Sequence, residues 1–397
     1  MSFRSRAHFG LSLALAAAVL SLPALHGQTA KTDAGKADAG KKDKAAKGES
    51  RSISFRSSDG VELQGNFYPA PSSGAKDACV LLLHNFSARN GGDSHAEGWD
   101  HLAAALQKEG YAVLTFDFRG FGKSKTVDKE FWNRVKHPQN QRLRNAVKMP
   151  EVIDRSEFPP DYYPNLANDV AAAKAYLDRK NDGREVNASN LVVIGAGEGA
   201  TVGALWMASE AHRKKDRASL TPGLPPDFDQ PESRDLSCAV WLSISPSLAG
   251  QRVQVRNWLV EVGRDLKVPM AFVYGTKDAR SMNFAVGAVG AIKPKTGAKK
   301  FDPKDTSDPR AYTGEKKLDN KLEAEKLLQK SLDTEKWIIK NYLADLFDAR
   351  PLREWRKRDA ERFAYVWAFP MMRPMLAKAP GEESPRALPL SMFFKAQ

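Results

Sequence analysis

The chain has 397 residues, of which 42% are hydrophobic, and a formal net charge of +13. This composition excludes a largely disordered scaffold, and the length suffices for one large domain with a full core. The positive charge fits an anionic envelope polymer or membrane surface as partner. Acidic residues interspersed among most basic segments fit an ordinary basic protein instead, and a nucleic-acid partner is not expected.

The N-terminus is typical of a secretory signal peptide, expected over residues 1–27. Arg4 and Arg6 precede the apolar segment GLSLALAAAVLSLPAL, and small residues follow it. An uncleaved N-terminal anchor is the alternative, and no apolar run of transmembrane length occurs after it. Residues 28–50 are rich in Lys, Ala and Gly and are expected to form a disordered tether. We therefore expect a secreted or periplasmic protein.

Strand-like and helix-like segments alternate along the domain expected at residues 51–350. It begins with a hairpin that turns at Asp59-Gly60. Apolar runs then predict strands buried on both faces, namely ACVLLLH, YAVLTF, NLVVIG, SCAVWLS and VPMAFVYG. Amphipathic helices are expected between them, in WDHLAAALQKEG, NLANDVAAAKAYLDRK and GATVGALWMASEAH. This order predicts an α/β fold with a mostly parallel, doubly wound sheet.

Three further segments depart from this pattern. Residues 125–164 are charged and proline-rich, as in an insertion or lid, and their aromatic residues either line a pocket or pack the lid itself (Trp132, Tyr162 and Tyr163). The pattern weakens after about residue 281, and residues 317–350 are expected to be helical. Residues 351–397, rich in aromatic residues and arginine, are expected to form a C-terminal extension across the domain surface.

The two cysteines, Cys79 and Cys238, both lie in apolar strand-like runs. Export would permit a disulfide, but we expect both side chains to be small buried hydrophobes.

Four motifs in the expected order resemble the α/β-hydrolase fold, in its serine esterase and peptidase-like branch. They are LLLHNF, where the family usually has His-Gly, DFRGFGKS, GAGEG and VYGTKD. The resemblance covers roughly residues 51–280. It implies a nucleophile elbow at GAGEG, a sharp strand-to-helix turn flanked by glycines. It also implies that Asp278 occupies the position of the catalytic acid.

Two members of the implied catalytic triad are missing. Gly197 occupies the nucleophile position, so no nucleophilic atom is present there. The family's histidine would follow Asp278, somewhere in the region of residues 300–320, but no histidine follows Asp278 in the chain. Serine chemistry needs a general base within hydrogen-bond reach. We therefore interpret Asp278 as a remnant acid and Gly197 as a vacant nucleophile position.

Other residues near the elbow have alternative roles. The backbone N–H groups of Phe86 and Glu198 are expected to converge as a remnant oxyanion site that could bind a carbonyl group or a small anion. The Glu198 carboxylate is either a substitute catalytic group or an acid at a helix N-terminus, and the latter is favoured. Ser87 is a second possible substitute, and His84 is expected to be structural. The sequence contains no metal-ligand spacing, and no cofactor is expected.

Three functions follow from these observations. The favoured one is an exported, catalytically inactive member of the fold that binds a small acyl or carboxylate ligand or a partner. An active hydrolase that uses atypical residues is the first alternative. A basic scaffold protein of the cell envelope, which binds anionic polymers through its Lys-rich tether and Arg-rich C-terminus, is the second.

Overall fold

The computed structural model describes residues 49–71, 76–95, 98–220, 235–293 and 308–358, without the side chains of 211–220. The expected signal peptide, nearly all of the expected tether and residues 359–397 of the expected extension lie outside the described residues. Within the described ranges, no helix combines the length and the apolar character needed to cross a membrane.

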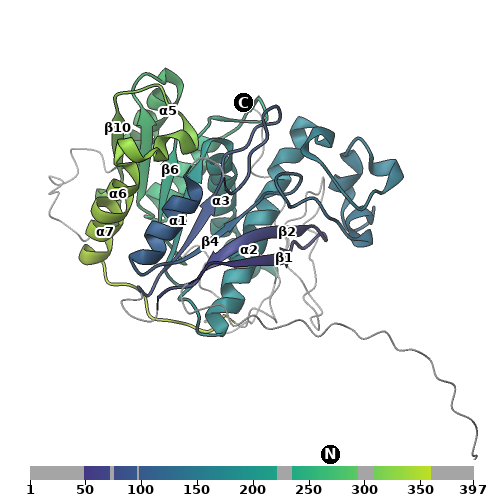
Figure 1. Cartoon of the computed structure of the whole chain (residues 1–397), viewed down its shortest axis with the longest axis horizontal. Coiled ribbons are helices and arrows are strands. Elements are labelled where there is room, and N and C mark those ends of the chain that lie inside the picture. Colours follow the sequence, from purple (N-terminus) through teal and green to yellow (C-terminus); the bar gives the residue numbers. More distant parts are fainter. Residues whose placement is uncertain (1–48, 72–75, 96–97, 221–234, 294–307, 359–397) are drawn as a thin grey trace, which may run out of the picture. The chain divides into compact units, whose positions relative to one another are not determined.

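An eight-stranded sheet organises the domain, in the order β1-β2-β4-β3-β5-β6-β9-β10 (Figure 1). The first two strands pair antiparallel, β2 pairs antiparallel with β4, and the remaining neighbours are parallel. A small antiparallel hairpin, β7–β8, lies outside this sheet. The strands are β1 (Arg51–Arg56), β2 (Glu62–Tyr68), β3 (Cys79–Leu83), β4 (Ala112–Phe116), β5 (Leu191–Ala196), β6 (Leu236–Leu242), β7 (Ser247–Leu248), β8 (Gln251–Arg252), β9 (Met270–Gly275) and β10 (Gly314–Leu318).

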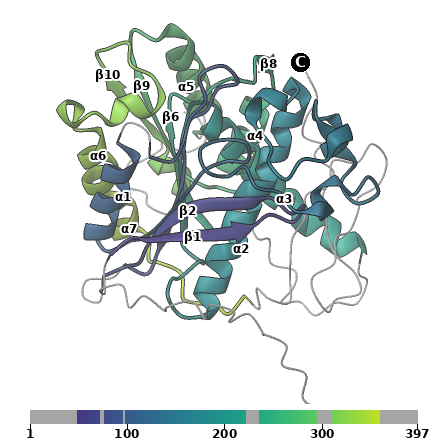
Figure 2. The ribbon, with the colours of Figure 1, turned by 45° about the vertical axis from the view of Figure 1, so that its right-hand side comes forward.

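Helices cover both faces of the sheet (Figures 1 and 2). The α-helices are α1 (Trp99–Lys108), α2 (Ala167–Asp182), α3 (Gly197–Leu220), α4 (Val255–Val260), α5 (Ala279–Ile292), α6 (Thr334–Lys336) and α7 (Ala344–Ala349). Two π-helical segments are η8 (Glu261–Asp265) and η12 (Trp337–Leu343). Short 3-10 helices are η1 (Lys129–Trp132), η2 (Pro138–Arg142), η3 (Ala146–Lys148), η4 (Arg155–Glu157), η5 (Pro160–Leu166), η9 (Pro309–Tyr312), η10 (Ala324–Leu328) and η11 (Lys330–Leu332).

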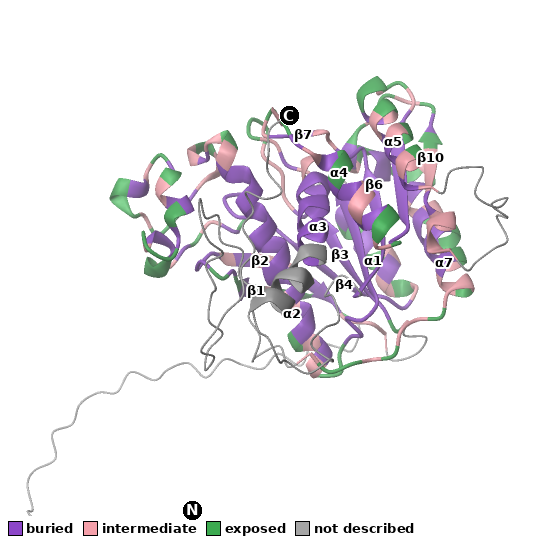
Figure 3. Ribbon diagram, turned by 180° about the vertical axis from the view of Figure 1, so that it is seen from behind, coloured by how far each residue is buried: buried purple, intermediate pink, exposed green. Residues whose placement is uncertain are grey.

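Alternate residues of the central strands supply two separate cores, because successive side chains of a strand point to opposite faces. Leu81 and Val193 belong to the core under α2, α3, α4 and α5. Val80 and Val192 belong to the core under α1, η12 and α7. The central strands are therefore apolar at nearly every residue, and the buried colour runs through the sheet (Figure 3). This arrangement confirms the predicted α/β fold with a mostly parallel, doubly wound sheet.

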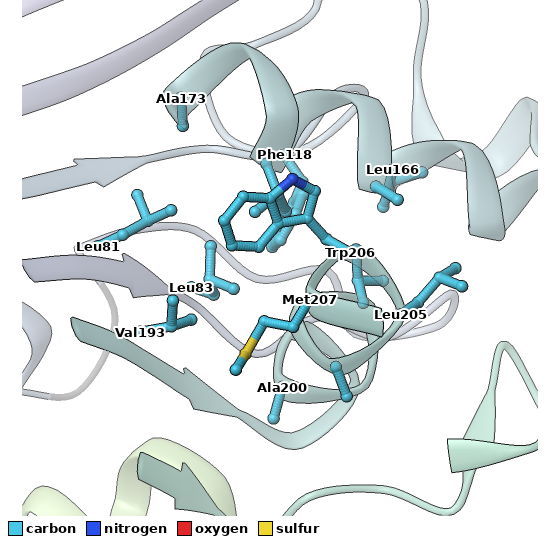
Figure 4. Close-up of a cluster of buried hydrophobic side chains, with 14 of the residues drawn as sticks. Leu81, Leu83, Phe118, Leu166, Ala173, Val193, Ala200, Leu205, Trp206 and Met207 are labelled. Atoms are coloured by element: carbon cyan, nitrogen blue, oxygen red, sulfur yellow. The ribbon is translucent and has the colours of Figure 1, made fainter. Parts of the chain in front are cut away.

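Helix α3 packs its first turns tightly against the sheet. Trp206, 1% exposed, lies on α3 in a cluster that includes Leu83 of β3 and Phe118, which follows β4 (Figure 4). A Cβ on Gly203 would lie 2.7 Å from Leu83 Cδ1. The start of α3, which carries the elbow, is thus fixed by close packing on the sheet.

The region after residue 281 differs from the sequence prediction. The expected helix at 317–350 is wrong at its start, because Lys317 and Leu318 belong to β10. This strand has the polar sequence GEKKL, since it is the last in the sheet and pairs only with β9, so no hydrophobic alternation marked it. Helix α5, which follows Asp278, was also not predicted.

Residues 351–358, which we call the strap, lie against the amino-terminal ends of β5 and β6. Asn190 accepts from the Arg353 amide and donates to the Arg353 carbonyl oxygen, both at 2.8 Å. Arg358 forms a 2.8 Å ion pair with the buried Asp235. The beginning of the expected C-terminal extension is therefore part of the folded domain.

Cys79 and Cys238, in β3 and β6, are buried and unpaired.

The insertion at 125–164 is joined to the domain by the buried Arg119. Its guanidinium donates to Asp59 at 2.6 and 2.9 Å, to Asp169 at 2.8 Å and to the Tyr162 hydroxyl at 3.1 Å. The aromatic residues of the insertion are buried: Tyr163 stacks on Phe86 with ring centroids 6.0 Å apart, and Trp132 donates to the Pro150 carbonyl oxygen at 2.9 Å. Tyr162 and Tyr163 thus pack the insertion onto the domain, whereas Trp132 packs within the insertion.

Candidate functional site

A cavity of about 660 Å³ opens where the parallel strands end, and we call it the elbow cavity. Its lining comes from the loops that follow β3, β5, β6, β9 and β10. This edge is where ligands bind in parallel α/β sheets. The lining residues are Asn85, Phe86, Ser87, Asn90, Gly197, Glu198, Ser243, Ser245, Pro246, Asp278, Arg280, Ser281 and residues 321–326.

The elbow has the backbone geometry that the sequence suggested. Gly197 has φ of 51°, in the left-handed region that favours glycine. A Cβ on Gly199 would lie 2.0 Å from the His84 carbonyl oxygen, and one on Gly195 would lie 2.8 Å from Ala200 Cα. The two flanking glycines therefore permit the close approach of β3, β5 and α3.

Asn85 occupies the space above the elbow. A Cβ on Gly197 would lie 2.0 Å from Asn85 Oδ1 and 2.6 Å from its Cγ. The same Oδ1 accepts a hydrogen bond from the Glu198 backbone N–H at 3.1 Å. The resemblance predicts that Glu198 N–H is one of the groups that would bind a substrate oxyanion. The amide oxygen of Asn85 thus takes the position of a ligand oxygen and excludes a side chain at residue 197.

The residues on either side of Asn85 have different surroundings. His84 is 1% exposed, and its Nε2 accepts from the Phe118 amide at 3.1 Å while its Nδ1 donates to the Asn85 carbonyl oxygen at 2.7 Å. Burial lowers the pKa of His84, which favours this neutral form. Phe86 packs against Phe118, Phe121 and Tyr163, and its amide has no hydrogen-bond acceptor within the described ranges.

Glu198 lines the cavity with a carboxyl group in an unusual environment. Its Oε2 accepts from the Ala249 amide at 3.0 Å. Burial raises the pKa of Glu198 to about 7, although this amide and the nearby charge of Arg280 act in the opposite direction. The carboxyl group is therefore divided between its two protonation states near neutral pH.

The free energy of unfolding is expected to depend on Glu198 between about pH 4.5 and pH 7. The folded state keeps the proton up to about pH 7, whereas the unfolded chain releases it near its ordinary value of 4.5. The contribution of this proton is therefore complete below pH 4.5 and lost as the pH rises through 7. Relative to Glu198→Gln, the wild type should lose about 1 to 3 kcal/mol over this interval.

Urea denaturation of both proteins from pH 4.5 to pH 8 measures this difference. Glu323→Gln, at an exposed residue of the same cavity, is the matched control. A constant difference between wild type and Glu198→Gln at every pH would contradict the assignment.

Asp278 lies at the same cavity, as its sequence position implied. Its Oδ1 accepts from the Ser281 amide at 3.2 Å, so the residue is the N-cap of α5. Its Oδ2 is buried and has no hydrogen-bond partner among the described residues. Asp278 thus caps α5 through Oδ1, and its Oδ2 takes no part in the cap.

The loop after β10 lines the cavity, and the resemblance predicts a histidine near the end of the last strand. Residues 321–326 line the cavity there, with side chains of both charges and no imidazole. This loop lies after the 300–320 region in which the histidine position was expected, and residues 300–307 lie outside the described ranges. Across the described ranges, no group of three or more His, Cys, Asp and Glu residues is placed to hold a metal ion.

The structure thus brings the sequence candidates Phe86, Ser87, Gly197, Glu198 and Asp278 to one cavity. Ser87 Oγ accepts from the Asn90 amide at 2.8 Å in a tight loop. His84 is not among the residues that line the cavity. Sequence reasoning missed the roles of Asn85 and Arg280, although the Asn in LLLHNF at the usual glycine position was a visible signal for the first.

Comparisons with known proteins agree with this architecture. The sequence model of the alpha/beta hydrolase family matches residues 80–389. The protein YfhR of Escherichia coli K12, described as uncharacterized, is 37% identical over 76 residues, which are 19% of this chain and 25% of that protein. The aligned part thus spans a quarter of the curated relative.

Two solved structures that match the chain are a hydrolase and a putative hydrolase. A dienelactone hydrolase of Anabaena variabilis is 14% identical with a TM-score of 0.42, and the match covers 77% of this chain and 100% of that one. A putative alpha/beta hydrolase of Agrobacterium tumefaciens is also 14% identical, with a TM-score of 0.45 and the same coverage.

Proposed function

The chain belongs to the alpha/beta hydrolase family, and from this premise we propose that it is a non-catalytic member that binds a small ligand in the elbow cavity. The observation that carries the proposal is the position of Asn85. Its Oδ1 fills the space next to Gly197 and accepts from Glu198 N–H, so the groups that would bind and attack a substrate carbonyl are occupied or missing. The absence of a histidine after Asp278 supports the same proposal.

The cavity offers partners for a small acyl or carboxylate ligand. The Phe86 amide has no acceptor in the described part of the chain, and Arg280 and Lys321 supply positive charge at the lining. The side chains of Ser243 and Ser245 add hydroxyl groups, of which Ser243 Oγ is buried without a partner in the described part of the chain. The N-terminal sequence supports an exported location for this binding protein, either secreted or periplasmic.

Turnover and binding assays on the purified protein test the proposal. We expect no hydrolysis of p-nitrophenyl acetate or butyrate above buffer, and a saturable thermal shift with short-chain carboxylates. Leu322→Trp should abolish this shift because it adds bulk at the lining. The matched control is Leu332→Trp, whose leucine packs against the same core but does not line the cavity.

An active hydrolase with atypical residues is the second candidate, and Glu198 is the observation that favours it. A carboxyl group with a pKa of about 7 in a cavity is suited to general acid–base catalysis. This candidate predicts turnover that is lost in Glu198→Gln and in Asp278→Asn. Asparagine still caps a helix, so the second variant removes the acid without removing the cap. Such a loss of turnover would overturn the binding proposal.

A further inference from the structure

A second depression of about 390 Å³ adjoins the elbow cavity and has a lining of one charge sign. The two share Pro246 and Arg280. Three guanidinium groups line the depression, from β8, α4 and α5, and the remaining lining is uncharged. The full lining is Pro246, Arg252, Arg256, Arg280, Asn283, Phe284 and Gly287.

None of these three arginines forms an ion pair with a carboxylate within the described ranges. Arginines elsewhere on the surface commonly do so, for example Arg264 with Asp265 and Arg310 with Asp308. Three like charges around one depression repel one another, and this repulsion is relieved when an anion binds between them. The arrangement is therefore suited to an anionic group that is not part of the described chain.

Two of the guanidinium groups are held in position by the protein. Arg256 donates to the Gly287 carbonyl oxygen at 3.2 Å, and Arg280 donates to Ser247 Oγ at 2.5 Å. Each guanidinium has five N–H donors, so most of them stay available. Donors fixed in this way lose less conformational entropy when they bind a ligand.

We propose that the depression formed by Arg252, Arg256 and Arg280 binds a multiply charged oxyanion of the phosphate-ester class. Planar guanidinium groups bind phosphate oxygens in pairs, and several donors from different elements can surround one tetrahedral group. The asparagine amide of residue 283 adds an uncharged donor to the same lining. The phosphate can belong to a soluble phosphate ester or to a lipid headgroup.

This inference does not rest on the absence of catalysis at the elbow. The anion would lie beside the elbow cavity, and its binding is measured separately from the binding of carboxylates there. Because the depression shares Arg280 with the elbow cavity, the variants below change Arg252 and Arg256 and leave the shared residue intact.

Binding to the full-length protein is tested by calorimetric titration with inorganic phosphate and glycerol phosphate at constant ionic strength. We expect saturable binding that weakens by about tenfold or more in the double variant Arg252→Gln/Arg256→Gln. The control Arg134→Gln/Lys148→Gln removes the same charge from exposed residues of the insertion and should bind like the wild type. All substituted residues are exposed, and melting temperatures show whether each variant is folded.

Co-sedimentation with phosphatidylcholine vesicles, with and without phosphatidic acid, distinguishes the source of the phosphate. Binding of the soluble esters alone identifies a soluble ligand, and a stronger, phosphatidic-acid-dependent sedimentation identifies a headgroup. Either result supports the proposal if the Arg252→Gln/Arg256→Gln variant loses phosphate binding and the control variant keeps it. The proposal is overturned if neither form of phosphate binds, or if both double variants lose binding equally.

Discussion

Replacement of Arg119 by methionine is expected to lower the free energy of unfolding by about 3 to 5 kcal/mol. The Arg119 side chain is completely buried and neutralises Asp59 and Asp169, whose side chains are 2% and 0% exposed. Methionine fills part of the volume but leaves two carboxylates buried without a counter-charge. Asp59 lies in the β1–β2 turn and Asp169 in α2, so the damage should reach the hairpin, the helix and, through Tyr162, the insertion.

Guanidinium denaturation measures the loss in free energy of unfolding, and two further variants show whether the buried charges cause it. Arg264→Met breaks an exposed pair with Asp265, with both side chains 51% exposed, and should cost much less than Arg119→Met because solvent screens the pair. Arg119→Met/Asp59→Asn/Asp169→Asn removes the two uncompensated buried carboxylates and should recover part of the stability. If Arg119→Met costs no more than Arg264→Met, the buried network does not contribute as described.

Gly197→Ser is expected to cost about 2 to 4 kcal/mol and to give no ester turnover. The serine must adopt a positive φ, and its Cβ would displace the Asn85 side chain from the Glu198 amide. The new hydroxyl group would still have no general base, because no histidine follows Asp278. Denaturation and a p-nitrophenyl ester assay test both parts.

Two comparisons separate the causes of this loss. Gly250→Ser imposes a similar backbone strain, at φ of 81°, but its Cβ would have no atom within 4 Å, so it should cost less than Gly197→Ser. Asn85→Ala removes Oδ1 and Cγ, the two nearest atoms that a side chain at residue 197 would meet. The free energy of unfolding of Gly197→Ser/Asn85→Ala should therefore exceed the value expected from adding the two single effects by about 1 kcal/mol. Additive single effects, or measurable ester hydrolysis by Gly197→Ser, would refute this account.

Much of the sheet could be predicted because burial on both faces leaves a strong sequence signal. Strands such as β5 and β6 are apolar at nearly every residue, and the glycines of GAGEG mark where β5 gives way to a helix. Strand β10 lacked any such signal, since an edge strand with half-buried and exposed residues does not need an apolar sequence. Sequence periodicity reports burial and not hydrogen-bond pairing.

The candidate site was predicted only in part, for a related reason. The resemblance identified Gly197, Glu198 and Asp278 from motifs, and those motifs depend on local backbone geometry. The position of the Asn85 side chain depends instead on the contact between the loop after β3 and the start of α3. The raised pKa of Glu198 likewise results from burial of its carboxyl group in the folded domain, and the Ala249 amide acts in the opposite direction. Neither property is encoded in a short motif.

The contacts of the strap determine the register in which residues 351–358 bind to the domain. Asn190 binds the backbone N–H and the carbonyl oxygen of Arg353, and Asn187 donates to the same oxygen. Asn181 donates to the Arg356 carbonyl oxygen, and Asp182 accepts from the Arg358 amide. Peptide groups are the same in every residue, so these contacts alone would accept the segment in more than one register. The side chains of Arg353 and Arg358 distinguish the registers, because they reach Ser189, Leu236 and Asp235. The backbone contacts thus hold the segment, while two arginines determine which residues are held.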